Sequence, residues 1–226
     1  MAEALRRRLG YRFRDSGLLA QALTHRSFGT PHNERLEFIG DAVLNCAVAL
    51  ALFERFPSTQ EGDLSRARAN LVNRDTLAQL ARQLDLGAHI RLGEGEARSG
   101  GADRTSIIAD ALEAVFGALF LDGGFDAARD VIDRVYADLL RATDPKTLGK
   151  DPKTRLQEWL QAHRYAVPEY EVTATSGEAH AQMFEVDCRI PALAIVTHGS
   201  GPSRRAAEQN AAAAAFARVV SDAFDG

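Results

Sequence analysis

The stretch NERLEFIGDAVL, residues 33–44, places three acidic side chains within an apolar helical pattern. Glu37 and Asp41 are four residues apart and therefore share one face of a helix, with Glu34 one turn earlier on the same side. Like charges at this spacing destabilise a helix slightly, and partial burial raises the cost unless each charge has a partner. The pattern therefore indicates either a solvated acidic face or a site for a cation.

A second stretch, residues 107–116, repeats this arrangement. Asp110 and Glu113 are three residues apart, and apolar residues surround them. Four carboxylates from two helices, without histidine or cysteine, supply the oxygen ligands that Mg²⁺ or Mn²⁺ takes. On the pattern alone, the solvated faces of two amphipathic helices remain an alternative to a metal site.

Residues 1–143 are predicted to form an all-α domain. Their apolar residues recur at helical spacing in four runs, which are 18–23, 36–53, 64–84 and 107–121. Proline and glycine residues follow these runs, including the pair Gly123-Gly124, and they indicate helix ends. Residues 144–151 contain proline and glycine and have little apolar content, so they are expected to be a linker.

Residues 152–224 show a different order of elements, α-β-β-β-α. Pro152 follows the capping residue Asp151, which predicts a helix from there to about Arg164. Three stretches then alternate with period two, namely 170–175, 183–188 and 194–197. Residues 199–203 lead into an alanine-rich helix. The second domain is therefore expected to be small and α+β.

The overall composition is that of an ordinary folded protein, with 46% hydrophobic and 26% charged residues among 226. Cys46 and Cys188 lie far apart without a CxxC pair, which argues against a disulfide scaffold or a structural zinc site. We find no signal peptide and no run near the ~18 apolar residues of a membrane span, so we expect a cytoplasmic protein without membrane association. The net charge of −4 argues at first against a nucleic-acid ligand.

The stretch at 33–44 resembles the signature of the bacterial ribonuclease III family, with Ile39 where leucine is more common. Further stretches follow in the family's order and spacing at 23–27, 61–65, 92–96 and 110–114, and the similarity extends over the second domain. The resemblance implies a metal-dependent endoribonuclease that hydrolyses double-stranded RNA to 5′-phosphate and 3′-hydroxyl ends. It also implies a homodimer that acts in ribosomal RNA precursor processing and in messenger RNA processing and turnover.

The resemblance also assigns roles to the acidic residues. It implies that the bound metal is Mg²⁺, with Mn²⁺ as a possible substitute, and that its ligands are Glu37, Asp41, Asp110 and Glu113. Asp41 and Glu113 match the positions most closely tied to catalysis. Glu34 and Glu61 match positions near the catalytic valley and the dimer interface, although Glu61 is equally well explained as a polar turn residue.

The second domain resembles a double-stranded-RNA-binding domain. A helix N-terminus with Ser203, Arg204 and Arg205 is suited to a phosphate, because its free N–H groups and its dipole attract anions. The resemblance implies further RNA contacts from the first helix and from one loop, through Thr154, Gln157, Glu158 and His180. The wider domain family tends to have lysine where Glu208 stands, which predicts weaker RNA binding by this domain alone.

Two other functions are compatible with parts of the sequence. A non-catalytic double-stranded-RNA-binding protein would be expected to lack Asp41 or Glu113, and both are present. A metal-dependent phosphohydrolase of small nucleotides would not need the second domain. The net charge does not exclude RNA, because removing four metal-binding carboxylates from −4 leaves 0, and phosphate contacts depend on local basic clusters. The cluster expected here is Lys150, Lys153, Arg155, Arg204 and Arg205.

Overall fold

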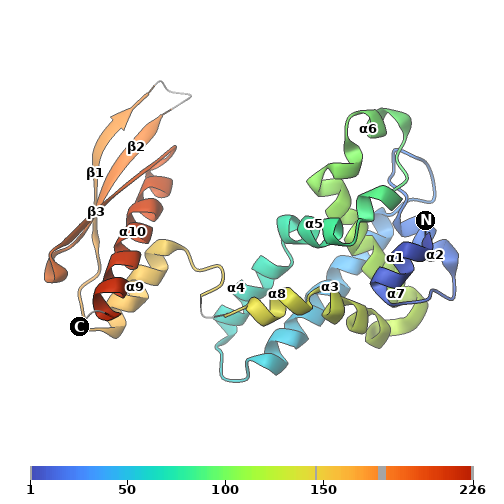
Figure 1. Cartoon of the computed structure of the whole chain (residues 1–226), viewed down its shortest axis with the longest axis horizontal. Coiled ribbons are helices and arrows are strands. Elements are labelled where there is room, and N and C mark those ends of the chain that lie inside the picture. Colours follow the sequence, from blue (N-terminus) through green and yellow to red (C-terminus); the bar gives the residue numbers. More distant parts are fainter. Residues whose placement is uncertain (1, 146, 178–181, 225–226) are drawn as a thin grey trace. The chain divides into compact units, whose positions relative to one another are not determined.

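A computed structural model describes residues 2–145, 147–177 and 182–224 of the chain. They form two compact units, which divide between Leu148 and Gly149 (Figure 1). The first unit is helical, and the second contains a three-stranded sheet with two helices. The predicted fold class is therefore confirmed. The predicted domain limits at 143 and 152 remain predictions, and Leu148 packs against the core of the first unit.

Eight helices make up the described part of the first unit. They are α1 (Ala2–Leu9), α2 (Ser16–Ala22), α3 (Glu34–Arg55), α4 (Glu61–Leu71), α5 (Arg74–Gln83), α6 (Glu94–Arg98), α7 (Thr105–Val135) and α8 (Ala137–Ala142), with 3-10 turns at Leu86–His89 and Gly101–Asp103. The single run expected over 64–84 is wrong, because α4 ends at Leu71 and α5 begins at Arg74. The Asn73 side chain starts the new helix by accepting a 2.9 Å hydrogen bond from the Thr76 N–H.

The helix expected over 107–121 is also longer than predicted. It kinks at Gly124, whose φ of 81° is not helical, and then continues to Val135 as the second half of α7. The Gly123-Gly124 pair therefore changes the direction of the helix and does not end it. The second half of α7 adds Ala128, Val131 and Ile132 to the core.

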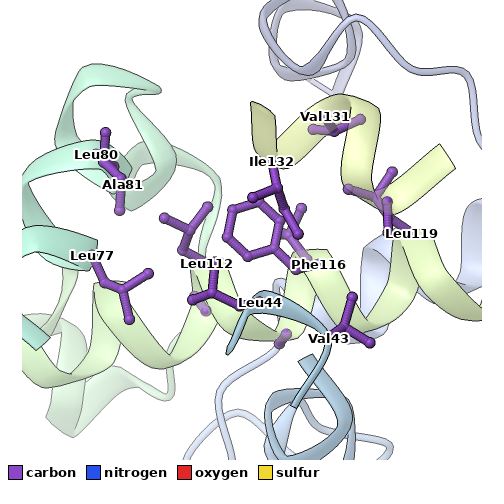
Figure 2. Close-up of a cluster of buried hydrophobic side chains, with 14 of the residues drawn as sticks. Val43, Leu44, Leu77, Leu80, Ala81, Leu112, Phe116, Leu119, Val131 and Ile132 are labelled. Atoms are coloured by element: carbon purple, nitrogen blue, oxygen red, sulfur yellow. The ribbon is translucent and has the colours of Figure 1, made fainter. Parts of the chain in front are cut away.

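The core of the first unit forms where α3, α5 and α7 meet. Figure 2 shows Val43 and Leu44 of α3 facing Leu112 and Phe116 of α7, with Leu77 of α5 beside them. Each of these five side chains is at least 94% buried, and Phe116 and Leu44 are fully buried. Burying a large apolar side chain stabilises the folded state by about 1.5–3 kcal/mol, so this contact fixes the position of α3 on α7.

Two glycines allow the backbones of α3 and α7 to touch. A Cβ atom built on Gly40 would lie 1.8 Å from the carbonyl oxygen of Glu113, and one on Gly117 would lie 2.1 Å from that of Leu36. No other residue type fits at these two positions without moving a helix. The close approach places the acidic faces of the two helices next to each other.

Helix α3 is the described helix that has the length and apolar character of a membrane span. Core helices of soluble proteins have the same properties, and the buried side chains of α3 pack within the first unit. The expected absence of a membrane segment remains a prediction.

The second unit has the predicted order of elements. They are α9 (Pro152–Ala162), β1 (Glu169–Ser176), β2 (Met183–Ile190), a 3-10 turn (Pro191–Leu193), β3 (Ile195–Gly201) and α10 (Arg204–Phe224). The sheet is antiparallel with the order β1-β2-β3. As predicted, Asp151 caps α9, and its carboxylate accepts a 3.0 Å hydrogen bond from the Thr154 N–H.

Strand β3 extends beyond the predicted residues 194–197. It includes Gly199 and Gly201, which were expected to lie in the connection to the last helix. A Cβ atom on Gly199 would lie 2.2 Å from the Ala211 nitrogen, so this glycine lets β3 pack directly against the alanine run of α10. The glycines therefore serve close strand–helix packing here, which a turn pattern does not reveal.

Candidate functional site

A pocket of about 910 Å³ opens between α3, α5 and α7 in the first unit. The loop between α2 and α3 and the helix α6 also contribute to its wall. Charged side chains line most of it, and they are Arg26, Glu34, Glu37, Asp41, Arg74, Glu96, Arg104, Asp110 and Glu113. The four carboxylates predicted from the sequence as metal ligands therefore lie in one pocket.

Three of these carboxylates form a compact group of half-buried side chains. One oxygen each from Glu37, Asp110 and Glu113 can be chosen so that all three lie within 4.8 Å of one another. Two oxygens on opposite sides of a Mg²⁺ ion are about 4.2 Å apart, so small side-chain adjustments suffice to bind one ion. A donor set made only of carboxylate oxygens fits a hard divalent cation.

Asp41 lies outside this group of three, although it lines the same pocket. It is exposed, and its carboxylate accepts a 2.9 Å hydrogen bond from the side-chain amide of Asn45, one turn further along α3. Asp41 is therefore a pocket residue that solvent and an incoming ligand can reach.

The electrostatics of the pocket disfavour its own negative charges. Burial is the main cause that raises the pKa of Glu113 to about 8, and the charges of Asp41, Asp110 and Glu37 raise it further. Burial also raises the pKa values of Glu37 and Asp110, and Arg74 opposes the effect at Asp110. Near neutral pH the three carboxylates therefore retain a proton, unless a bound cation replaces that proton.

We expect the metal-free protein to be less stable at about pH 8 than at about pH 6. Folding raises the pKa of Glu113, so the folded state holds a proton that the unfolded state has released, and stability falls as pH rises towards the folded pKa. Because Glu113 is only partly buried, solvent screening reduces the effect to about 1–2 kcal/mol.

Thermal unfolding in EDTA at these two pH values measures this difference. The Glu113→Gln variant provides the control, because it should lose much of the pH dependence. An equal pH dependence in the variant would contradict the assignment to Glu113.

The two accessory glutamates occupy different places. Glu34 lines the pocket and forms a 3.1 Å ion pair with Arg26. Glu61 lies in a separate groove of about 320 Å³ between α3 and α4, where it accepts a 2.6 Å hydrogen bond from Ser65. The structure thus brings Glu34 to the carboxylate pocket and leaves Glu61 in a groove with Phe53.

Sequence reasoning missed the basic side chains of the pocket. Arg104 forms a 2.7 Å ion pair with Glu96, and both line the pocket. Arg74 lines it from the first residue of α5. The only sequence signal for Arg74 is its place at a helix start after Asn73. The apolar pattern over residues 64–84 continues across this position, so the sequence does not show that a helix starts there.

In the second unit, three predicted RNA contacts lie at the start of α10. The Ser203 hydroxyl accepts a 3.2 Å hydrogen bond from the Ala206 N–H and so caps the helix. Arg204 and Arg205 are exposed in the first turn. The Arg204 guanidinium donates a 2.9 Å hydrogen bond to Glu208.

The predicted contacts on α9 are partly engaged within the unit. The Thr154 hydroxyl donates a 3.1 Å hydrogen bond to Asp151, and Glu158 accepts one of 2.6 Å from Lys150. Gln157 is exposed. His180 lies outside the residues that the structure describes.

Glu208 lies between two of the basic residues of the second unit. Its carboxylate accepts a 2.6 Å hydrogen bond from Lys153 of α9 as well as the bond from Arg204. The bond from Lys153 is the main cause that lowers the pKa of Glu208, so the glutamate is ionised near neutral pH. One carboxylate therefore partly neutralises two cations next to the N-terminus of α10.

Two family models match this chain. A model described as Ribonuclease-III-like matches residues 15–139, and a model of the double-stranded RNA binding motif matches residues 152–219. Ribonuclease 3 of Ralstonia nicotianae is 61% identical over 93% of this chain and 82% of its own length. Ribonuclease 3 of Bordetella avium is 60% identical over 96% of this chain and 87% of its own length.

Solved structures give the same result for the first unit. The nuclease domain of ribonuclease III from Campylobacter jejuni is similar with a TM-score of 0.60 and 45% identity, over 61% of this chain and 97% of that domain. That structure is described as showing flexibility in a region involved in dimer formation of the domain. A second structure of the same domain has a TM-score of 0.60 and 44% identity.

Proposed function

The chain belongs to the ribonuclease III family, and we propose that it cleaves double-stranded RNA with Mg²⁺ held by the carboxylates of α3 and α7. It is a ribonuclease III-type endoribonuclease with a second domain for binding double-stranded RNA. The observation that supports the metal centre is the grouping of Glu37, Asp110 and Glu113 within 4.8 Å in one pocket.

The carboxylates have distinct roles in this proposal. Glu37, Asp110 and Glu113 hold Mg²⁺, for which Mn²⁺ can substitute, and Asp41 completes the site from the solvent side. A bound divalent ion lowers the pKa of a coordinated water and neutralises charge on the phosphate oxygens. Asp41 and Glu113 orient the reacting groups, and hydrolysis leaves 5′-phosphate and 3′-hydroxyl ends.

The second unit binds the RNA through two helices. Arg204 and Arg205 contact phosphates, because they extend from the first turn of α10, where the helix dipole also attracts anions. Ser203 fixes this turn through its cap bond to Ala206. Thr154, Gln157 and Glu158 contact the minor groove, whose 2′-hydroxyls identify RNA.

The enzyme acts as a homodimer in this proposal. The groove beside Glu61 is apolar, and Phe53 within it is 68% exposed, while Phe38 on the same helix is 80% exposed. Exposed aromatic side chains of this size favour association with a partner surface, and a second copy of the chain would cover them. Sedimentation equilibrium of the full chain measures the assembly.

The cellular tasks follow from the substrate class. A double-stranded-RNA endonuclease in the cytoplasm would process ribosomal RNA precursors and structured messenger RNAs, and would act without membrane association. RNA profiles of cells that lack the enzyme test this part of the proposal, and unprocessed ribosomal precursors are the expected result.

Incubation of the full chain with uniform duplex RNA, in Mg²⁺ or in EDTA, tests the reaction itself. We expect cleavage with Mg²⁺ only, and products that carry 5′-phosphates. Binding without cleavage under both conditions would support the non-catalytic alternative. Hydrolysis of small nucleotides without cleavage of the duplex would support a phosphohydrolase.

We expect Glu208→Gln to raise the affinity for duplex RNA by about three- to tenfold at low salt. The change releases Lys153 and Arg204 from one carboxylate, so both cations can contact phosphates. Equilibrium binding in EDTA measures the effect without cleavage.

A matched control removes one negative charge elsewhere in the same unit. Glu169→Gln, at the exposed start of β1, serves this purpose. If both variants gain the same affinity, the effect comes from net charge and not from the release of Lys153 and Arg204.

A further inference from the structure

Three arginines line the carboxylate pocket, and two of them are paired with acidic side chains. Arg26 forms a 3.1 Å ion pair with Glu34, and Arg104 forms one of 2.7 Å with Glu96. Arg74 has neither an ion pair nor a side-chain hydrogen bond with any residue that the structure describes. Its exposed guanidinium therefore keeps its donors for a ligand in the pocket.

The backbone position of Arg74 is fixed relative to the carboxylates. It is the first residue of α5, which starts at the Asn73 cap. Leu77 and Leu80 bury the same helix against the core that contains α7, the helix of Asp110 and Glu113. Because the helix already fixes the backbone of Arg74, binding a ligand in the pocket restricts only the side chain and costs little further conformational entropy.

Helix stability does not account for an arginine at this position. The N-terminus of a helix carries the positive end of its dipole, so a cation in the first turn is unfavourable there. Arg74 instead lines the same pocket as Asp110 and Glu113. It is thus close enough to the carboxylates to interact with a group that they recruit.

We propose that Arg74 binds a phosphate of the RNA strand that enters the carboxylate pocket and so positions the backbone for cleavage. A guanidinium presents paired N–H donors that match two phosphate oxygens. The inference rests on the proposed function, since it requires duplex RNA in this pocket. Arg74 is a binding and positioning residue here, and it transfers no proton.

The salt dependence of RNA binding tests this contact directly. Each phosphate contact contributes about one to the slope of log affinity against log salt. In the full chain with Glu113→Gln, which prevents cleavage, Arg74→Ala should lower this slope by about one. Arg141→Ala, an exposed arginine of α8 outside the pocket, should leave it unchanged. An unchanged slope with Arg74→Ala would overturn the proposal.

Cleavage by otherwise wild-type enzyme gives a second measurement. We expect Arg74→Ala to lower kcat/KM by about tenfold or more, and Arg74→Lys to restore part of the loss. If Arg74 only offsets the carboxylates, its removal instead tightens Mg²⁺ binding and leaves the salt slope intact, which refutes the contact. Wild-type enzyme that fails to cleave the duplex would refute the proposed function, whereas normal cleavage by Arg74→Ala refutes only this inference.

Discussion

Glu113→Gln is expected to abolish cleavage of double-stranded RNA while the protein still folds and binds the duplex. The change preserves the shape of the side chain and removes one of the half-buried negative charges of the proposed metal centre. Metal catalysis contributes several kcal/mol to phosphate hydrolysis, and each 1.36 kcal/mol corresponds to about tenfold in rate, so we expect a loss of about a thousandfold or more.

Single-turnover cleavage measures the rate, and a binding assay on the same duplex confirms that the RNA domain still works. Asp138→Asn is the control, because it neutralises an exposed carboxylate on α8 that lies outside the pocket. The metal-free Glu113→Gln variant should melt at or above the temperature of the wild type, since repulsion among the carboxylates decreases. Cleavage at the wild-type rate would refute the metal centre.

The faces of the two acidic helices could be predicted from the sequence, because helical spacing alone places Glu37 with Asp41 and Asp110 with Glu113. The contact between these two helices could not be predicted from helical spacing. It depends on Gly40, which touches the backbone of α7 more than 70 residues away in the sequence. Gly40 marks a close contact and Gly62, also inside a helix, marks none, so a helical glycine in the sequence shows neither whether a neighbour is present nor which segment it is.

The charges around the site show the same limit. The sequence indicated an acidic cluster, but the pKa of Glu113 depends on burial and on three carboxylates from α3 and α7. Arg74 lines the pocket from the start of α5, and the apolar pattern over residues 64–84 does not show that a helix starts there. In the second unit, Glu208 was recognised as a departure from lysine, whereas its partner Lys153 lies 55 positions away. Local patterns identify elements, and long-range contacts complete the sites.

Gly40→Ala is expected to destabilise the first unit and to disrupt the carboxylate cluster. The new Cβ atom would lie 1.8 Å from the Glu113 carbonyl oxygen, and this backbone atom cannot move independently of α7. Overpacking of a core costs about 1–3 kcal/mol, and a clash between two backbones belongs at the upper end. A loss of about 3 kcal/mol corresponds to a decrease in melting temperature of about 10 °C for a domain of this size.

The position of the metal ligands should change together with stability. To relieve the clash, α3 must shift away from α7, which separates Glu37 from Asp110 and Glu113 and weakens Mg²⁺ binding. Gly62→Ala on α4 is the matched control, since no atom lies within 4 Å of its Cβ position and alanine favours a helix by up to about 1 kcal/mol. Thermal unfolding and Mg²⁺ titration of both variants separate the two effects. If Gly40→Ala melts like the control and binds Mg²⁺ like the wild type, then contact between the helix backbones does not hold the site together.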